Sequence, residues 1–167
     1  MRARTFAAVV LVVVAAVVIQ TTLFGRVRVI TPDLVLLVSI LLALTRIRPE
    51  VVLGIAFTSG LAIDLLGSSL LGLRAIVFTT AAFIAIRTRE RADIGRIATA
   101  IWAGLISLVA VLLLVLLATL FGQSSILGEH VATRLLTVPL ANALIAFFVA
   151  PALVRVVDQD PAALRYS

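Results

Sequence analysis

The sequence contains no cysteine, no lysine and only one histidine. Without cysteine the chain cannot form disulfides, bind metals through thiolates or use a thiol nucleophile. The lone histidine, His130, leaves little basis for a histidine metal site or a proton relay, and we therefore expect no metal and no cofactor. Charged residues are scarce as well, at 13% of the 167 residues, against about 25% in a typical soluble domain.

Apolar residues make up 63% of the chain, and the mean hydropathy is +1.27. A water-soluble fold typically contains about 45–50% apolar residues, so this chain would leave much apolar surface in water. We therefore predict a single integral membrane domain over residues 1–167. The fourteen arginines are scattered in small groups between apolar runs. This pattern is typical of the loops of membrane proteins and argues against a nucleic-acid interface.

The apolar runs predict an all-α membrane protein with about six transmembrane helices. A helix needs about 20 residues to cross about 30 Å of hydrocarbon. The first, fifth and sixth runs are long enough, and the other three are short. An alternative with five crossings joins residues 51–73 into one helix, but Gly67-Ser68-Ser69 favours a turn there. The predicted spans are about 5–24, 33–45, 51–66, 70–86, 97–121 and 132–154.

Arginine counts predict the orientation. With six spans and a cytoplasmic N-terminus, ten arginines fall on the cytoplasmic side and four on the outer side, as the positive-inside rule favours. We therefore expect both termini and a charged loop at residues 87–96 in the cytoplasm. The outer four are Arg26, Arg28, Arg74 and Arg134, and the inner ten are Arg2, Arg4, Arg46, Arg48, Arg87, Arg89, Arg91, Arg96, Arg155 and Arg165.

Asp64 and Arg74 flank the turn between the third and fourth spans. An unpaired Asp at the centre of a membrane helix costs about 2.5–3.5 kcal/mol on insertion scales, so a partner or a wet pocket is expected. Arg74 lies on the neighbouring helix at a similar depth. The favoured interpretation is an intramembrane ion pair that fixes the hairpin. A partner-binding site and a proton or ion path are the alternatives.

Small residues recur four positions apart in the same spans. In lipid, this spacing lets helix backbones approach closely. Internal packing and contact with another membrane protein are both compatible with it. The pairs are Gly54 and Thr58, Ala56 and Gly60, and Ala81 and Ala85, and Gly67 and Gly72 add to the small residues of the hairpin.

Two prolines mark further features of the predicted helices. Pro32 and Asp33 suit a helix start, because proline is tolerated at the first helical position and an acidic residue complements the helix dipole. Pro139 and Asn142 predict a kink with a hydrogen-bonding Asn in the last span.

No catalytic constellation is recognisable. Ser68 and Ser69 have no nearby base to activate a nucleophile, and the chain has no phosphate-binding loop. His130 follows Glu129 in a predicted outer loop and is expected to be solvated. The sequence therefore predicts a protein that is not an enzyme.

The whole chain resembles the MreD family of rod shape-determining proteins. The resemblance is carried by Pro32-Asp33-Leu34 and by Gly60-x-x-x-Asp64-Leu65-Leu66-x-x-x-x-Leu71-Gly72-Leu73. Families of this kind commonly have His or Tyr after that Leu-Gly-Leu, where this chain has Arg74. The resemblance implies a non-enzymatic scaffold in the bacterial inner membrane that controls cell shape and sidewall peptidoglycan synthesis.

The expected partner is MreC, with indirect links to the MreB filament, to RodA and to a class B penicillin-binding protein. We expect the hairpin that carries Ala56, Gly60, Asp64, Gly67 and Gly72 to dock MreC, with Gly60 at the contact. The fold implied is similar to that of the substrate-binding subunits of energy-coupling-factor transporters. This similarity supplies an alternative function, a substrate-binding subunit of a vitamin transporter. The chain offers few polar and aromatic residues for such a pocket.

Overall fold

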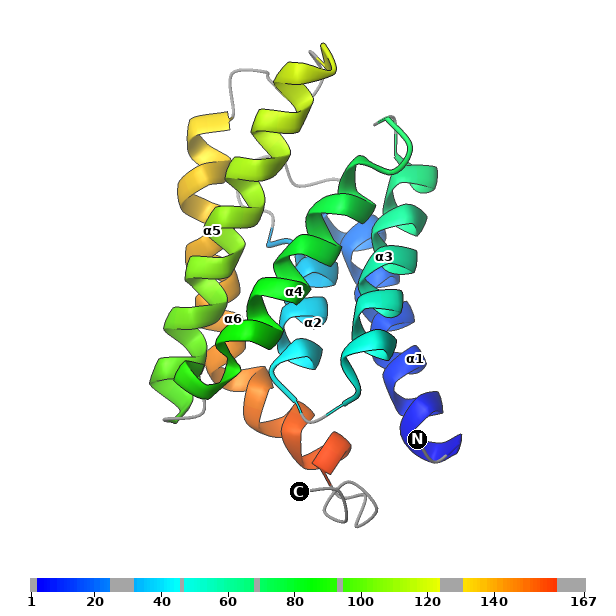
Figure 1. The fold of residues 1–167 in the computed structure, drawn as a ribbon, viewed down its shortest axis with the longest axis vertical. Helices are drawn as coiled ribbons and strands as arrows, with labels where there is room; N and C mark the ends of the chain where they lie inside the picture. Colours follow the sequence, from blue (N-terminus) through cyan, green and yellow to red (C-terminus); the bar gives the residue numbers. More distant parts are fainter. Residues whose placement is uncertain are drawn as a thin grey trace.

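The computed structural model describes residues 3–24, 32–45, 47–67, 70–92, 95–123 and 131–158, and within these ranges every regular element is a helix. The all-α prediction with six α-helices is therefore confirmed (Figure 1). The elements are α1 (Ala3–Ile19), continued by the π-helical turn η1 (Gln20–Phe24), then α2 (Leu34–Ala43), α3 (Pro49–Leu66), α4 (Leu73–Ala92), α5 (Arg96–Leu120) and α6 (Val131–Asp158).

The helices run up and down in alternation. The starts of α1, α3 and α5 and the end of α6 lie at the lower end of Figure 1, and the ends of α3 and α5 and the starts of α4 and α6 lie at the upper end. α3 packs along α4 and α5 packs along α6, while α4 also packs against α5. The bundle therefore consists of two antiparallel hairpins joined through α4, with α1 and α2 packed against them.

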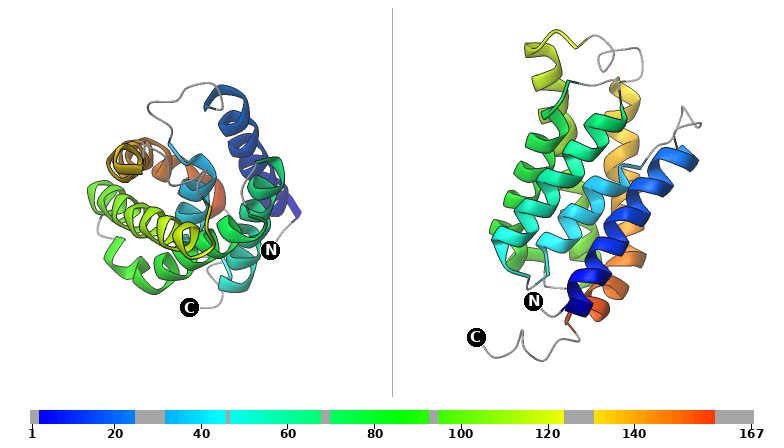
Figure 2. Two further views of the ribbon diagram at one scale, coloured as in Figure 1. Left: turned by 90° about the horizontal axis from the view of Figure 1, so that it is seen from above. Right: turned by 90° about the vertical axis from the view of Figure 1, so that its right-hand side faces the viewer.

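Helix α2 forms the centre of the bundle. It has ten residues, about 15 Å at 1.5 Å per residue, which is half the thickness of the hydrocarbon. It contacts α1, α3, α4, α5 and α6, and nine of its ten residues, Val35 to Ala43, are buried. Figure 2 shows it surrounded by the other helices in the view from above. Because protein covers α2 on all sides, its length is not set by the bilayer, which explains the short second span of the sequence.

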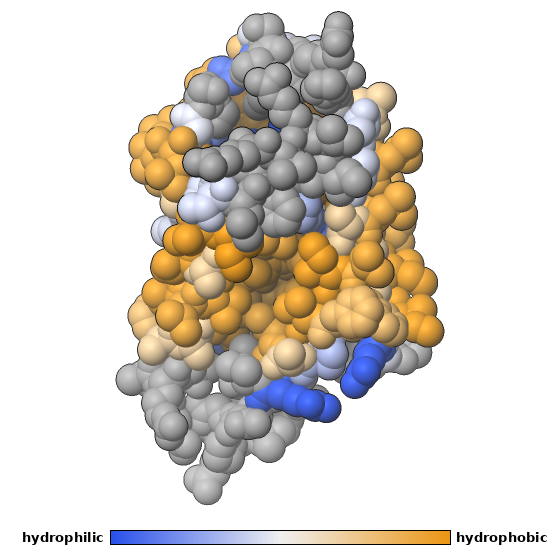
Figure 3. Space-filling model, turned by 180° about the vertical axis from the view of Figure 1, so that it is seen from behind, coloured by the Kyte–Doolittle hydropathy of each residue, from blue (hydrophilic) through white to orange (hydrophobic). Residues whose placement is uncertain are grey.

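Among the described residues, three helices are long and apolar enough to cross a membrane, namely α3, α5 and the part of α6 from Val131 to Leu153. The shorter apolar helical segments are Phe6–Thr22 and Leu34–Ala43. An apolar belt crosses the middle of the face seen in Figure 3, and strongly hydrophilic residues lie at the lower edge of this belt. The chain is thus an all-α membrane protein, and α2 depends on its neighbours for its place in the bilayer.

Helix α4 differs most from its prediction. The prediction of a loop at residues 87–96 is wrong for the first six of these residues, because α4 continues without interruption to Ala92. At its other end α4 begins at Leu73, three residues later than expected, after a turn that includes Gly72 with a φ of +91°. The five-crossing alternative is also wrong, since α3 ends at Leu66 and Gly67 is extended.

Helix α5 turns its large side chains outward and its small ones inward. Lipid is as apolar as a leucine side chain, so membrane helices associate through close packing of small residues rather than by burying large ones. Toward α6, a Cβ on Gly104 would lie 3.0 Å from the Ala143 Cβ. The exposed residues include Ile97, Ile101, Leu105, Leu112, Leu116 and Leu120, and the buried ones include Ala100, Ala103, Gly104, Ser107 and Ala110.

Candidate functional site: a polar cluster joining four helices

Asp64 caps helix α4 from the neighbouring helix α3. Its side chain is completely buried, and its Oδ2 accepts hydrogen bonds from the backbone N–H groups of Gly72 (3.0 Å) and Arg74 (2.9 Å). These N–H groups lie at the start of α4, where the helix itself supplies no acceptor. The carboxylate also complements the positive end of the helix dipole. Asp64 therefore fixes the geometry of the hairpin through the backbone as well as through charge.

The Arg74 guanidinium lies between two carboxylates. Its Nε is 3.8 Å from Asp64 Oδ1, and its Nη1 is 3.7 Å from Asp33 Oδ2. Both distances are ion-pair contacts and too long for hydrogen bonds. The structure thus places Arg74 beside Asp64, and it adds Asp33, a charge partner that sequence analysis considered only as a helix start.

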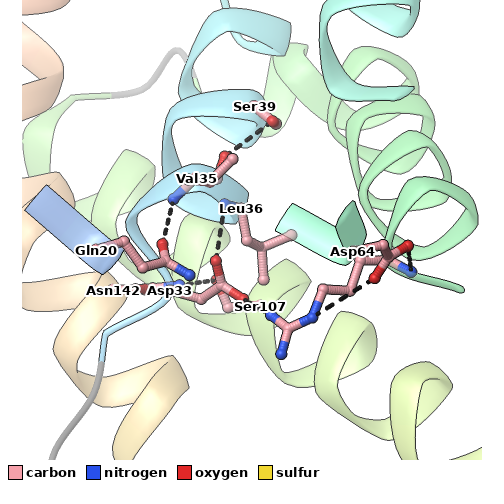
Figure 4. Close-up of polar contacts among 9 residues, drawn as sticks. Gln20, Asp33, Val35, Leu36, Ser39, Asp64, Ser107 and Asn142 are labelled. Carbon is pink, nitrogen blue, oxygen red and sulfur yellow. Dashed lines mark hydrogen bonds and ion pairs between the residues drawn. The ribbon is translucent and has the colours of Figure 1, made fainter. Parts of the chain in front are cut away.

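Asp33 and Gln20 complete the start of the central helix. Asp33 is the N-cap of α2, and its Oδ1 accepts the N–H of Leu36 at 3.1 Å. The Oε1 of Gln20, in η1, accepts the N–H of Val35 at 3.0 Å (Figure 4). A buried helix start needs such partners, because its first N–H groups have none within the helix. Pro32 is buried and precedes this cap, so it lies outside the helix. The sequence had predicted that Pro32 occupies the first helical position.

These contacts form one polar cluster, defined here as Gln20, Asp33, Asp64 and Arg74. It ties η1, α2, α3 and α4 together with two carboxylates and one guanidinium. Each carboxylate accepts a backbone N–H and faces the guanidinium, so the cluster holds helix ends in place. Within the described part of the chain there is no group of three or more His, Asp or Glu residues that could hold a metal ion. Ser68, Ser69 and His130 lie outside the described residues.

Helices α3 and α4 approach each other closely at Gly60. A Cβ on Gly60 would lie 2.6 Å from the Ala75 Cα and 2.7 Å from the Arg74 carbonyl oxygen. Ala56, one turn earlier, is also fully buried. The expectation that Gly60 contacts MreC is therefore wrong, because α4 already occupies that face.

The other small residues of the hairpin divide between inside and outside. Ala81 and Ala85 are buried. Gly54 and Thr58 are exposed, and a Cβ on Gly54 would meet nothing within 4 Å. Gly67 is exposed at the end of α3, and Gly72 donates its N–H to Asp64. The exposed Gly54–Thr58 face remains open to a partner helix.

A second polar contact joins α5 and α6, and only its α6 partner, Asn142, was predicted from the sequence. Asn142 Nδ2 donates to Ser107 Oγ at 3.0 Å, and both side chains are fully buried. Gly104, one turn before Ser107, lets Pro139 and Ala143 approach α5 closely. Pro139 and Asn142 were predicted from the sequence, whereas Gly104 and Ser107 were not. The spacing of small residues along α5 carried the signal for both.

Comparison with known proteins identifies one family. The family model described as rod shape-determining protein MreD matches residues 2–157. No curated protein matches the chain. No solved structure matches it either. The expected likeness to transporter substrate-binding subunits therefore stays a prediction.

Proposed function

Since the chain belongs to the MreD family of rod shape-determining proteins, we propose that it is a non-enzymatic scaffold subunit of the bacterial cell-elongation complex. In this role it regulates sidewall peptidoglycan synthesis through MreC. MreC in turn links it to the MreB filament, to RodA and to a class B penicillin-binding protein. The family match carries this proposal, and it already establishes a role in determining rod shape.

The arrangement of polar groups supports a scaffold. Asp33, Asp64 and Arg74 face one another and the first N–H groups of α2 and α4, and Asn142 binds Ser107. These side chains hold helices together, and the face of the molecule seen in Figure 3 is largely apolar across its middle. An exterior of this kind suits an activity that consists of contacts with other membrane proteins.

We further propose that the protein is a multi-pass protein of the inner membrane with both termini in the cytoplasm. The start of α1 and the end of α6 lie at the same end of the bundle (Figure 1). Five exposed arginines gather at that end, namely Arg48, Arg87, Arg89, Arg96 and Arg155, whereas the opposite end has the exposed Arg134 and Arg74, which faces two carboxylates. This asymmetry agrees with the positive-inside rule.

Single introduced cysteines test the orientation, because the chain has none of its own. We expect Thr133→Cys, at the upper end, to react with a membrane-impermeant maleimide in spheroplasts. Glu90→Cys, at the lower end, should react only after the membrane is opened. Both positions are exposed, so neither change disturbs the packing. Labelling in the opposite order would overturn the orientation, and labelling of both from one side would overturn the up-and-down crossing pattern.

The docking of MreC is tested on the Gly54–Thr58 face. Gly54→Leu places a large side chain there without an internal clash. We expect this variant to insert at normal levels, to lose copurification with MreC, and to give rounded cells when it is the sole copy in the native host. Depletion of the wild-type protein should give the same shape. Ala15→Leu, an equally exposed position on α1, is the matched control and should retain MreC.

The outcomes separate the proposals. Normal copurification of MreC with Gly54→Leu would overturn this docking face. Absence of MreC from the wild-type preparation would overturn the choice of partner. Depletion that leaves cell shape intact but abolishes uptake of a vitamin would favour the transporter function instead.

A further inference from the structure

Arg87 lies at the lower end of α4 in a defined geometry. Its guanidinium carbon is over the ring of Phe83, 5.2 Å from the ring centroid, and both side chains are exposed. This cation–π contact holds the guanidinium at one position on the helix surface. A planar guanidinium held over a ring still offers N–H groups at its edge, and these match the oxygens of a phosphate as a bidentate pair.

The neighbouring Trp102 indicates the depth of this position. Its indole N–H donates to the carbonyl oxygen of Thr88 at 3.1 Å, which joins α5 to α4 beside Arg87. Tryptophan is enriched at the level of the lipid headgroups, where its ring and its N–H meet different surroundings. Together with the exposed arginines at this end of the bundle, Trp102 favours a position of Arg87 near the lipid headgroups.

The surface around Arg87 is amphipathic. Toward the middle of the bilayer, the same face of α4 carries Phe83 and Ile76, which are 46% and 52% exposed. Toward the end of the bundle, Arg89 and Arg96 are exposed, and among the described residues neither they nor Arg87 form an ion pair. An apolar strip on α4 thus leads to Arg87 at an end of the bundle where exposed arginines outnumber the exposed Glu90.

We propose that Arg87, held over Phe83 at the arginine-bearing end of α4, binds the phosphate of an anionic phospholipid whose acyl chains lie along Phe83 and Ile76. Continuity between the apolar strip and Arg87 favours a lipid over an acidic protein segment, because one amphipathic molecule satisfies both. The site lies on α4 at the arginine-bearing end. It is separate from the polar cluster and from the Gly54–Thr58 face.

The single tryptophan of the chain provides the test. The full-length protein is reconstituted in phosphatidylcholine vesicles with a minor fraction of brominated phosphatidylglycerol, and quenching of Trp102 fluorescence is compared with that by brominated phosphatidylcholine. We expect the site to bind phosphatidylglycerol about fivefold more strongly than phosphatidylcholine. This is the effect that one arginine has on attraction to an anionic membrane surface. Equal quenching by the two lipids would overturn the proposal.

Matched variants separate a built site from general attraction by charge. Arg87→Gln should reduce the preference to near one. Arg155→Gln removes the same charge at the same end of the bundle, from α6, and should leave the preference unchanged. Arg87→Lys keeps the charge without the planar fork and should fall between the two. An equal loss of preference in Arg87→Gln and Arg155→Gln would overturn the site, as would relief of the quenching by soluble glycerol phosphate.

Discussion

Replacing Gly60 with alanine is expected to destabilise the protein more than the same change at any other described glycine of α3. The added Cβ would lie 2.6 Å from the Ala75 Cα and 2.8 Å from the Ala75 nitrogen, both backbone atoms of α4. A flexible side chain could move aside, but a helix backbone moves only if the helix shifts. Overpacking typically costs about 1–3 kcal/mol, and we expect the upper part of that range here. Gly60→Leu should yield no folded protein.

The matched control is Gly54→Ala, six residues earlier on the same helix. Nothing lies within 4 Å of a Cβ at Gly54, so this change should leave stability unchanged or raise it slightly through helix propensity. Unfolding in mixed detergent and dodecyl sulfate micelles, followed by circular dichroism, compares the free energies of unfolding. Equal stability of the two alanine variants would contradict the close approach of α3 and α4 at Gly60.

Removing the Asp64 carboxylate is expected to have the second large effect. Asp64→Ala leaves the N–H groups of Gly72 and Arg74 without their acceptor and removes one of the two carboxylates beside Arg74. Loss of one partner from a buried charge pair costs about 3–5 kcal/mol, because the other charge is left uncompensated. Arg74→Ala should cost less, since it keeps both backbone hydrogen bonds of Asp64 and removes a charge that is partly exposed.

A double-mutant cycle tests this assignment. Asp64→Ala combined with Arg74→Ala should destabilise the protein by less than the sum of the single changes, because both changes remove the same contact between the Asp64 carboxylate and the Arg74 guanidinium. Asp64→Asn keeps an acceptor for the N–H groups and loses the charge, so it should lie between the wild type and Asp64→Ala. Strict additivity would exclude the coupling, and a larger loss for Arg74→Ala than for Asp64→Ala would contradict the capping role.

Asp64 also shows how a single residue can serve two purposes in this family member. Its carboxylate aligns the start of α4, and its ion pair with Arg74 brings Asp33 and therefore α2 to the same place. The destabilisation expected from Asp64→Ala should consequently spread beyond the hairpin. Protease protection of α2 would measure that spread, as a second readout of the same variant.

The sequence by itself determined the helical class, the membrane environment and the approximate place of each helix. Long apolar runs, scarce charge and turn residues such as Gly67 are local signals, and they act before any tertiary contact forms. The motif from Gly60 to Leu73 also led to the MreD family, whose model matches residues 2–157. Asp64 and Arg74 flank one short turn, and the structure has their side chains 3.8 Å apart, while an ion pair that fixes the hairpin stays a prediction.

Only the tertiary structure decided how those helices use their residues. The approach of Asp33 to Arg74 joins positions 41 residues apart in the chain, and no periodicity encodes such a contact. Gly60 could equally have faced a partner or α4, because four-residue spacing of small residues specifies close packing but not the identity of the neighbour. The helical continuation of α4 through the Arg87–Arg91 stretch could not be predicted either. Arginine is common both in helices and in loops at the membrane edge, so its presence does not show where the helix ends. Burial and proximity arise only when the helices assemble into the bundle, so the contacts of Asp33 and Gly60 could be established only from the tertiary structure.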